Sequence, residues 1–147
     1  MNQVRIALSL VILTLLLLRA TPSWAAVQVA ISAPSTLITN KGPVSYTLTY
    51  TGATTINLLP SHIAVSTVDS APGVLPGVAF DAITPLDISC SGNTSCNVSI
   101  KNISGNGSVF ISVASGTADS GTDGNAAGPS TSFIVDNLAP TVKVNPP

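Results

Sequence analysis

Hydrophobic and polar residues alternate strictly along residues 43–51, whose sequence is PVSYTLTYT. Val44, Tyr46, Leu48 and Tyr50 occupy every second position, and Ser or Thr fills the positions between them. A period of two, carried by β-branched and aromatic residues, predicts a half-buried β-strand whose apolar side faces a core. We therefore expect Tyr46 and Tyr50 to be core residues and not a platform that stacks on sugars.

Short runs of the same kind recur through the rest of the chain. They are Val27–Ile31, Ile56–Leu59, Ile63–Thr67, Val74–Phe80, Leu86–Cys90, Cys96–Ile103, Ser108–Ala114 and Thr131–Asp136. Turn-forming residues separate them, and no stretch of ten residues after residue 25 has a helical period. Short strands at intervals of about eight to twelve residues predict an all-β chain, folded as one antiparallel β-sandwich.

One connection carries a strong local signal. Ser104-Gly105-Asn106-Gly107 is typical of a hairpin turn, because Asn and Gly tolerate the positive φ angles that such turns need. The turn predicts that Asn97–Ile103 pairs with Ser108–Ala114 in one sheet. Residues 115–129 are interpreted as a polar loop before the last strand.

Residues 1–25 have the three parts of a secretory signal peptide. Arg5 supplies the positive charge, an apolar run extends from Ile6 to Leu18, and small residues follow at Ser23 and Ala25. The apolar run is short for a membrane span, so cleavage after Ala25 is the prediction and an uncleaved N-terminal anchor the alternative. We expect a mature chain without a transmembrane segment, secreted or held at the cell surface, with the periplasm as another location.

Export changes the interpretation of the two cysteines. Cys90 and Cys96 are expected to form a disulfide in an oxidising compartment, within one hairpin or loop. A loop this short is stabilised by about 2 kcal/mol in the chain-entropy model. A redox motif needs two intervening residues, and a structural metal site needs more Cys or His ligands.

The composition excludes several classes of function. The chain has six acidic residues, all Asp, with five Lys or Arg and one His. After residue 25 the only basic residues are Lys41, Lys101 and Lys143, too few for the basic patch that nucleic-acid binding requires. His62 has no Glu to orient it, and no G-x-S-x-G, metal-binding or phosphate-binding motif is present. We therefore expect a structural His62 and no enzymatic activity.

Several segments carry a family resemblance. They are Ile31–Ser35, Gly42–Tyr50, Ile103–Gly107, Val109–Ala118, Asp123–Ala126, Gly128–Ser130, Phe133–Asn137 and Ala139–Val142. In this order and spacing they resemble the bacterial immunoglobulin-like repeats of large exported surface and adhesin proteins. The resemblance implies one immunoglobulin-like sandwich over residues 26–136. Residues 137–147 would be a Pro-rich linker or the start of a following repeat.

The resemblance also implies a function. Such repeats are normally strung in tandem, so we expect a non-catalytic spacer or adhesion unit whose partners are neighbouring repeats or a surface protein or carbohydrate. The sequence departs from the family pattern in holding one module and in its Cys pair. The alternative is a free-standing secreted domain that binds a carbohydrate or a protein, which exposed aromatic residues in one loop cluster would favour.

Calcium is the one cofactor that the sequence suggests. Asp119, Asp123 and Asn125 crowd one loop, and Asp136 ends the last predicted strand beside the linker. Carboxylate and amide oxygens at one end of a sandwich suit a hard cation such as Ca²⁺. The family resemblance implies the same, because related repeats often place acidic residues at module junctions. The alternative is a solvated loop in which Asp and Asn only cap turns. No other cofactor is expected.

Overall fold

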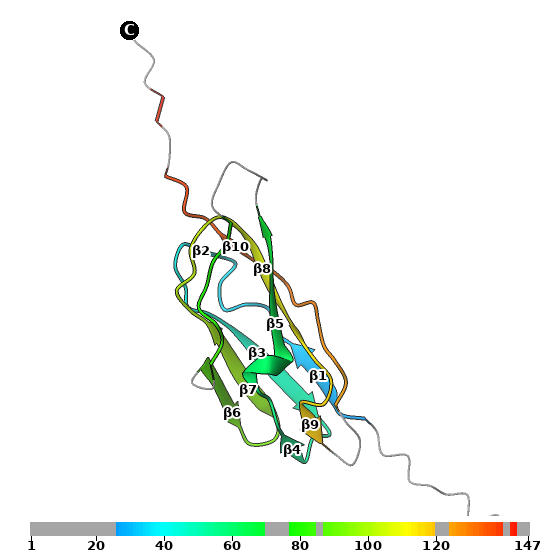
Figure 1. Cartoon of the computed structure of the whole chain (residues 1–147). Coiled ribbons are helices and arrows are strands. Elements are labelled where there is room, and N and C mark those ends of the chain that lie inside the picture. Colours follow the sequence, from blue (N-terminus) through cyan, green and yellow to red (C-terminus); the bar gives the residue numbers. More distant parts are fainter. Residues whose placement is uncertain (1–25, 70–76, 85–86, 120–123, 140–141, 144–147) are drawn as a thin grey trace, which may run out of the picture.

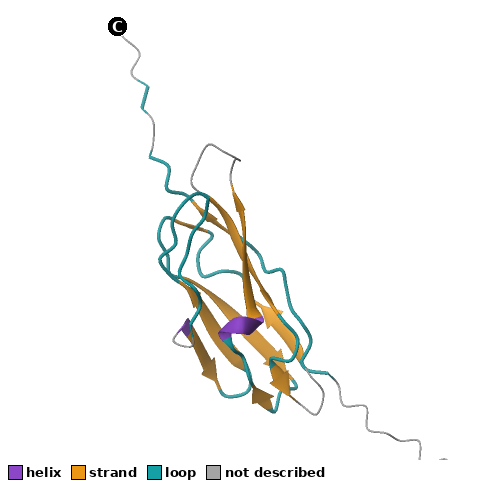
Figure 2. Ribbon diagram, in the orientation of Figure 1, coloured by secondary structure: helices purple, strands orange, loops and turns teal. Residues whose placement is uncertain are grey.

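The computed structural model describes residues 26–69, 77–84, 87–119, 124–139 and 142–143. Their strands form two four-stranded sheets that pack against each other, together with a small two-stranded ribbon (Figures 1 and 2). A short 3-10 helix, η1 (Pro60–His62), leads directly into a strand of the second sheet. The prediction of an all-β sandwich is confirmed at this level. The predicted signal peptide lies outside the described residues.

The first sheet, called sheet A, has the strand order β1-β3-β7-β6. Its strands are β1 (Gln28–Ile31), β3 (Val44–Thr51), β6 (Ile88–Ser91) and β7 (Ser95–Ile100), and all neighbours pair antiparallel. The alternation of residues 43–51 produces the expected pattern, because the four apolar side chains of β3 are buried and the Ser and Thr side chains face outward.

The second sheet, called sheet B, has the strand order β2-β10-β8-β5. Its strands are β2 (Ile38–Thr39), β5 (Ile63–Asp69), β8 (Gly107–Val113) and β10 (Phe133–Val135). β10 pairs antiparallel with β8 but parallel with β2, which corrects the expectation of a wholly antiparallel sandwich. The ribbon pairs β4 (Thr55–Ile56) with β9 (Ala118–Asp119), a strand inside residues 115–129, for which the sequence predicts a loop.

The core lies between the inward faces of the two sheets. Its largest fully buried side chains are Tyr46, Phe133, Leu48, Ile100 and Ile111. The Tyr46 ring packs against Phe133 with 6.4 Å between ring centroids, and its hydroxyl donates to the carbonyl of Thr131 at 3.0 Å. Tyr46 therefore connects sheet A to the segment that leads into β10. The prediction that Tyr46 and Tyr50 belong to the core is confirmed.

The predicted hairpin between residues 97–103 and 108–114 is wrong. β7 and β8 lie in different sheets, where β7 pairs with β3 over six positions and β8 pairs with β5 over seven. These long ladders outweigh the local preference of the connecting turn. That turn crosses between the sheets, and the Ile103 amide donates to the carbonyl of Lys41 on the way. The hairpin that does form joins β6 to β7.

Two other predicted strands differ from the structure. The run Ile56–Leu59 contributes only its first residue to a strand, because β4 ends at Ile56. Of the run Val74–Phe80, residues 77–80 are described, and they form an isolated bridge between Ala79 and Ser104 and no strand.

The chain enters and leaves the sandwich at opposite ends (Figure 1). We call the end that holds Val27, the ribbon and Asn125 the N-terminal pole; there the Asn125 amide donates to the carbonyl of Val27 at 3.0 Å. At the other end, the C-terminal pole, β10 ends opposite Gly107, the first residue of β8. The full length of β8 therefore separates the two poles.

Candidate functional site

The structure places the described calcium candidates at the two ends of the sandwich. Asp119 is the last residue of β9 and Asn125 follows in the next described segment, so both lie at the N-terminal pole. Asp136 follows β10 at the C-terminal pole, where its carboxylate accepts from the Leu138 amide at 3.0 Å. One ion cannot bind residues at both poles. The structure thereby corrects the expectation that placed Asp136 beside the other three.

Asp123 lies outside the described residues, so calcium at the loop after β9 stays a prediction. Among the described residues, no group of three His, Cys, Asp or Glu side chains is close enough to hold a metal ion. Asp136 caps its own turn through its hydrogen bond to the Leu138 amide, which is the capping role considered as the alternative.

His62 lies at the end of η1, where its Nδ1 accepts from the Leu59 amide at 3.3 Å. This contact closes the 3-10 turn that leads into β5, so a structural role accounts for the imidazole.

The described aromatic residues bear on the alternative function, which is the binding of a carbohydrate or a protein. Tyr46, Tyr50 and Phe133 are buried and Phe80 and Phe110 half-buried, so the described part of the chain offers no exposed aromatic platform.

Cys90 and Cys96 form a disulfide, as predicted. They are directly opposed on β6 and β7, so the bond fastens the edge strand β6 to its neighbour and does not join the two sheets. Cys96 is buried, whereas Cys90 is exposed at the sheet edge. Because disulfides persist in oxidising surroundings, the bond indicates an extracytoplasmic location. None of the described helices is long and apolar enough to cross a membrane.

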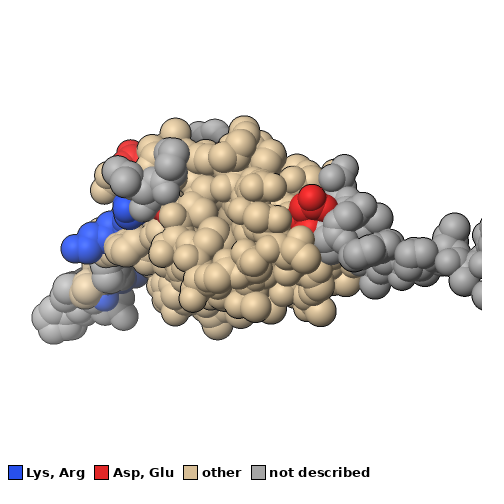
Figure 3. All heavy atoms as spheres, turned by 90° about the horizontal axis from the view of Figure 1, so that it is seen from below, with Lys and Arg blue, Asp and Glu red and all other residues tan. Residues whose placement is uncertain are grey.

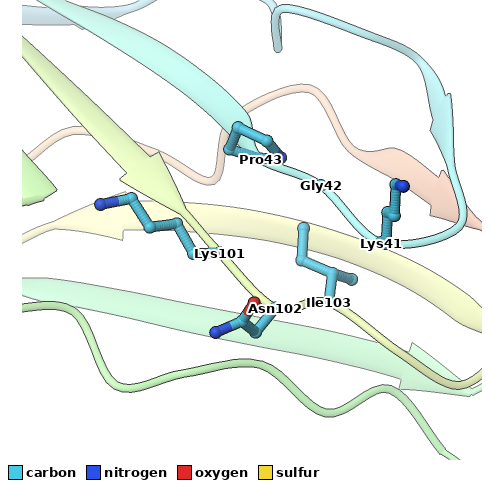
Figure 4. Close-up of a pocket in the computed structure, with 6 residues that line it drawn as sticks. All are labelled: Lys41, Gly42, Pro43, Lys101, Asn102 and Ile103. Atoms are coloured by element: carbon cyan, nitrogen blue, oxygen red, sulfur yellow. The ribbon is translucent and has the colours of Figure 1, made fainter.

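A pocket of about 480 Å³ opens at the C-terminal pole (Figure 4). Gly42, Pro43 and Ile103 form its apolar part, and Lys41 and Lys101 extend from its two sides in different directions. The side-chain amide of Asn102 donates through Nδ2 to the Asp81 carboxylate at 2.6 Å. Two ammonium groups beside a pocket can attract an anion, but the Lys101 ammonium is already paired with Asp87. The pocket therefore lacks the converging groups that define an anion site.

Asp87 is held by three hydrogen bonds. The Lys101 ammonium lies 2.6 Å from one carboxylate oxygen, and the Thr84 hydroxyl and amide donate to the other at 2.6 and 2.9 Å. The hydrogen bond from Lys101, followed by those from Thr84, lowers the pKa of Asp87 from 3.8 to about 2. The cluster fastens the start of β6 to the end of β7.

We expect this cluster to make the free energy of unfolding depend on pH in the acid range. Because the pKa of Asp87 is lower in the folded chain, its contribution is complete above about pH 4 and disappears as the pH falls toward about 2. Asp87→Asn should remove this part of the pH dependence, and Lys101→Met should reduce it. Urea unfolding across this range checks the prediction, and equal acid sensitivity in wild type and Asp87→Asn would contradict it.

The outward faces of the two sheets are free of charge along their length. β1, β3, β6, β7, β8 and β10 contain no charged residue, and β5 contains one at its last position, Asp69. Figure 3 shows the molecule from below, where blue and some red atoms lie at one edge of the view, other red atoms lie near the opposite edge, and the surface between them is uncharged. The charged groups therefore concentrate near the poles, and neutral surface separates them.

Exposed apolar side chains on sheet B are the feature that the sequence analysis missed. Ile38, Val68 and Ile134 project outward and are about half or more exposed. The signal was present in Phe133-Ile134-Val135, because three consecutive apolar residues in a strand must place one of them on the outer face.

The comparisons with known proteins add no relative. No family model matches the chain, and neither the curated proteins nor the solved structures searched give a significant match.

Proposed function

We propose that the chain is a non-catalytic, exported immunoglobulin-like module that acts as a structural spacer or adhesion unit of a secreted or cell-surface protein. The observation that carries the proposal is the position of the two ends of the fold. The chain enters at one pole and leaves at the other, which is the arrangement that modules in series require (Figure 1).

The strand orders support an immunoglobulin-like topology. In that fold, strands A, B, E and D form one sheet, and G, F and C form the other. Sheet A has the order β1-β3-β7-β6, which corresponds to A-B-E-D, and sheet B has β10-β8-β5, which corresponds to G-F-C. β2 continues the first strand and pairs parallel with β10. The Cys90–Cys96 bond lies within one sheet, so it is not equivalent to the disulfide that joins the two sheets of antibody domains.

The surfaces favour a spacer over an enzyme or a sugar-binding domain. Loops and sheet edges are available for adhesion, and the outward positions of the strands create no charged site. The absence of exposed aromatics among the described residues removes the feature that would have favoured carbohydrate binding.

A tandem fusion tests the proposal. Two copies of residues 26–147 are placed in series behind residues 1–25, and the exported product is studied by small-angle X-ray scattering. We expect recovery of a chain beginning at Ala26, with a maximum dimension close to twice that of one copy. Retention in the cytoplasm, or a fusion no longer than a single copy, would contradict the proposal.

A further inference from the structure

One row of outward side chains crosses all four strands of sheet B. Val68 of β5 lies opposite Ser108 of β8, Ser108 lies opposite Ile134 of β10, and Ile134 lies opposite Ile38 of β2. Val68, Ile134 and Ile38 are 59%, 48% and 62% exposed. Phe110, two positions beyond Ser108 on the same face, is half-buried. We call Ile38, Val68, Phe110 and Ile134 the sheet B patch.

Sheet A provides the internal contrast. The outward positions of its two central strands hold only Ser, Thr and Asn: Ser45, Thr47, Thr49 and Thr51 on β3, and Ser95, Asn97 and Ser99 on β7. Isolated exposed apolar residues are common on protein surfaces, but adjoining ones on a single face indicate a surface that another molecule covers. The chain thus places large apolar side chains outward on one sheet and excludes them from the central strands of the other.

We propose that a second copy of this chain covers the sheet B patch. The two copies pack face to face about a two-fold axis that runs parallel to the strands, between β8 and β10. Across the interface the second copy therefore presents its four strands in the opposite order. Ile38 faces Val68 of the second copy, and Ile134 faces Ser108 of the second copy. Ile38, Val68 and Ile134 therefore each face either another apolar side chain or a small serine.

Charge does not oppose this pairing. The outward positions of β5, β8 and β10 carry Ala, Ser, Val, Phe and Ile and no ionised group. An isologous interface brings identical patches together, so any charge in the patch would face its own copy. A neutral, apolar patch avoids that repulsion.

The size of the patch determines the strength of the dimer. Four strands about 4.8 Å apart and seven residues of about 3.3 Å each limit the face to about 450 Å² per copy, or about 900 Å² in total. Stable protein interfaces bury about 1,200–2,000 Å². The pair is therefore weak and depends on concentration. Because the axis is parallel to the strands, the chains of both copies run in the same direction. This direction suits modules that are displayed side by side, an inference that rests on the proposed function.

Sedimentation equilibrium of the exported chain tests the pairing. We expect a reversible dimer at high concentration. Ile38→Thr/Ile134→Thr should raise its dissociation constant at least about tenfold, because two buried isoleucine side chains are lost from each copy. Leu59→Thr is the matched control, since Leu59 is equally exposed but lies before η1, away from the patch. A monomer at millimolar concentration, or an equal effect of Leu59→Thr, would overturn the proposal.

Cysteine cross-linking tests the orientation. A mixture of Ile38→Cys and Val68→Cys chains should form a covalent dimer on mild oxidation, whereas Ile38→Cys alone should not, because the axis keeps the two Ile38 positions on opposite sides of the interface. Efficient cross-linking of Ile38→Cys alone would overturn the proposed geometry. A chain that stays monomeric but doubles in length as a tandem fusion would overturn the pairing and leave the spacer function standing.

Discussion

Phe133→Ala is expected to lower the free energy of unfolding by about 3–5 kcal/mol, the range found when a buried Phe is replaced by Ala. Phe133 is fully buried, packs on the Tyr46 ring and lies opposite Val109 in sheet B. β10 has only three residues and links β8 to β2. A cavity at Phe133 therefore weakens both the inter-sheet packing and the attachment of β2.

Urea unfolding of the exported chain measures this effect. Ile134→Ala is the matched control, because Ile134 is the next residue of the same strand and faces outward. It should cost less than about 1 kcal/mol at concentrations where the chain is monomeric. If Ile134→Ala destabilised the fold as much as Phe133→Ala, the inward and outward faces of β10 would be assigned incorrectly.

Gly107→Ala is the second large effect that we expect. Gly107 begins β8 with a φ of +155°, and a Cβ there would lie 2.5 Å from the carbonyl oxygen of Val68. The added methyl must push β5 away from β8 while the backbone keeps a conformation that L-residues rarely adopt. We expect a loss of about 2–4 kcal/mol from strain and overpacking together.

Thermal unfolding of Gly107→Ala and Gly116→Ala separates the two causes. Gly116 also has a positive φ, +80°, but nothing lies within 4 Å of the position of its Cβ. Gly116→Ala should therefore cost only the backbone part, about 1 kcal/mol. Equal losses in the two variants would contradict the close approach of β5 to β8 at Gly107.

The parts of the fold that could be predicted from sequence are those in which one strand carries its own signal. The alternation through Tyr46 and Tyr50 placed β3 and its buried face correctly, because the period of two depends only on that segment. The short spacing of Cys90 and Cys96 likewise predicted a disulfide that stays within one sheet.

Pairing between strands could not be predicted in the same way. The turn at Ser104–Gly107 favoured a hairpin locally, but the pairing of β7 with β3 and of β8 with β5 involves residues far apart in the sequence. The parallel contact between Ile38 and Ile134 has no local signal at all, because β2 has two residues and pairs only with β10, which is far away in the sequence.

Asp136 lies away from the other described calcium candidates for a related reason. Asp119 and Asp136 are close in the sequence, and their closeness suggested one site. Between them the chain returns along the sandwich from the N-terminal pole to the C-terminal pole, ending in β10 beside β8. Residues near in sequence are therefore separated by the length of the module, and the same geometry supports the spacer function.

The distance between the poles is the most direct test of the account. Nitroxide labels at Asn125→Cys and Leu138→Cys mark the two ends, and both native cysteines are already joined in the disulfide. Because the seven residues of β8 alone span about 23 Å, pulsed electron paramagnetic resonance should give one distance beyond about 25 Å. A main distance below about 15 Å would place both labels at one end, and would contradict a module that passes its chain from pole to pole.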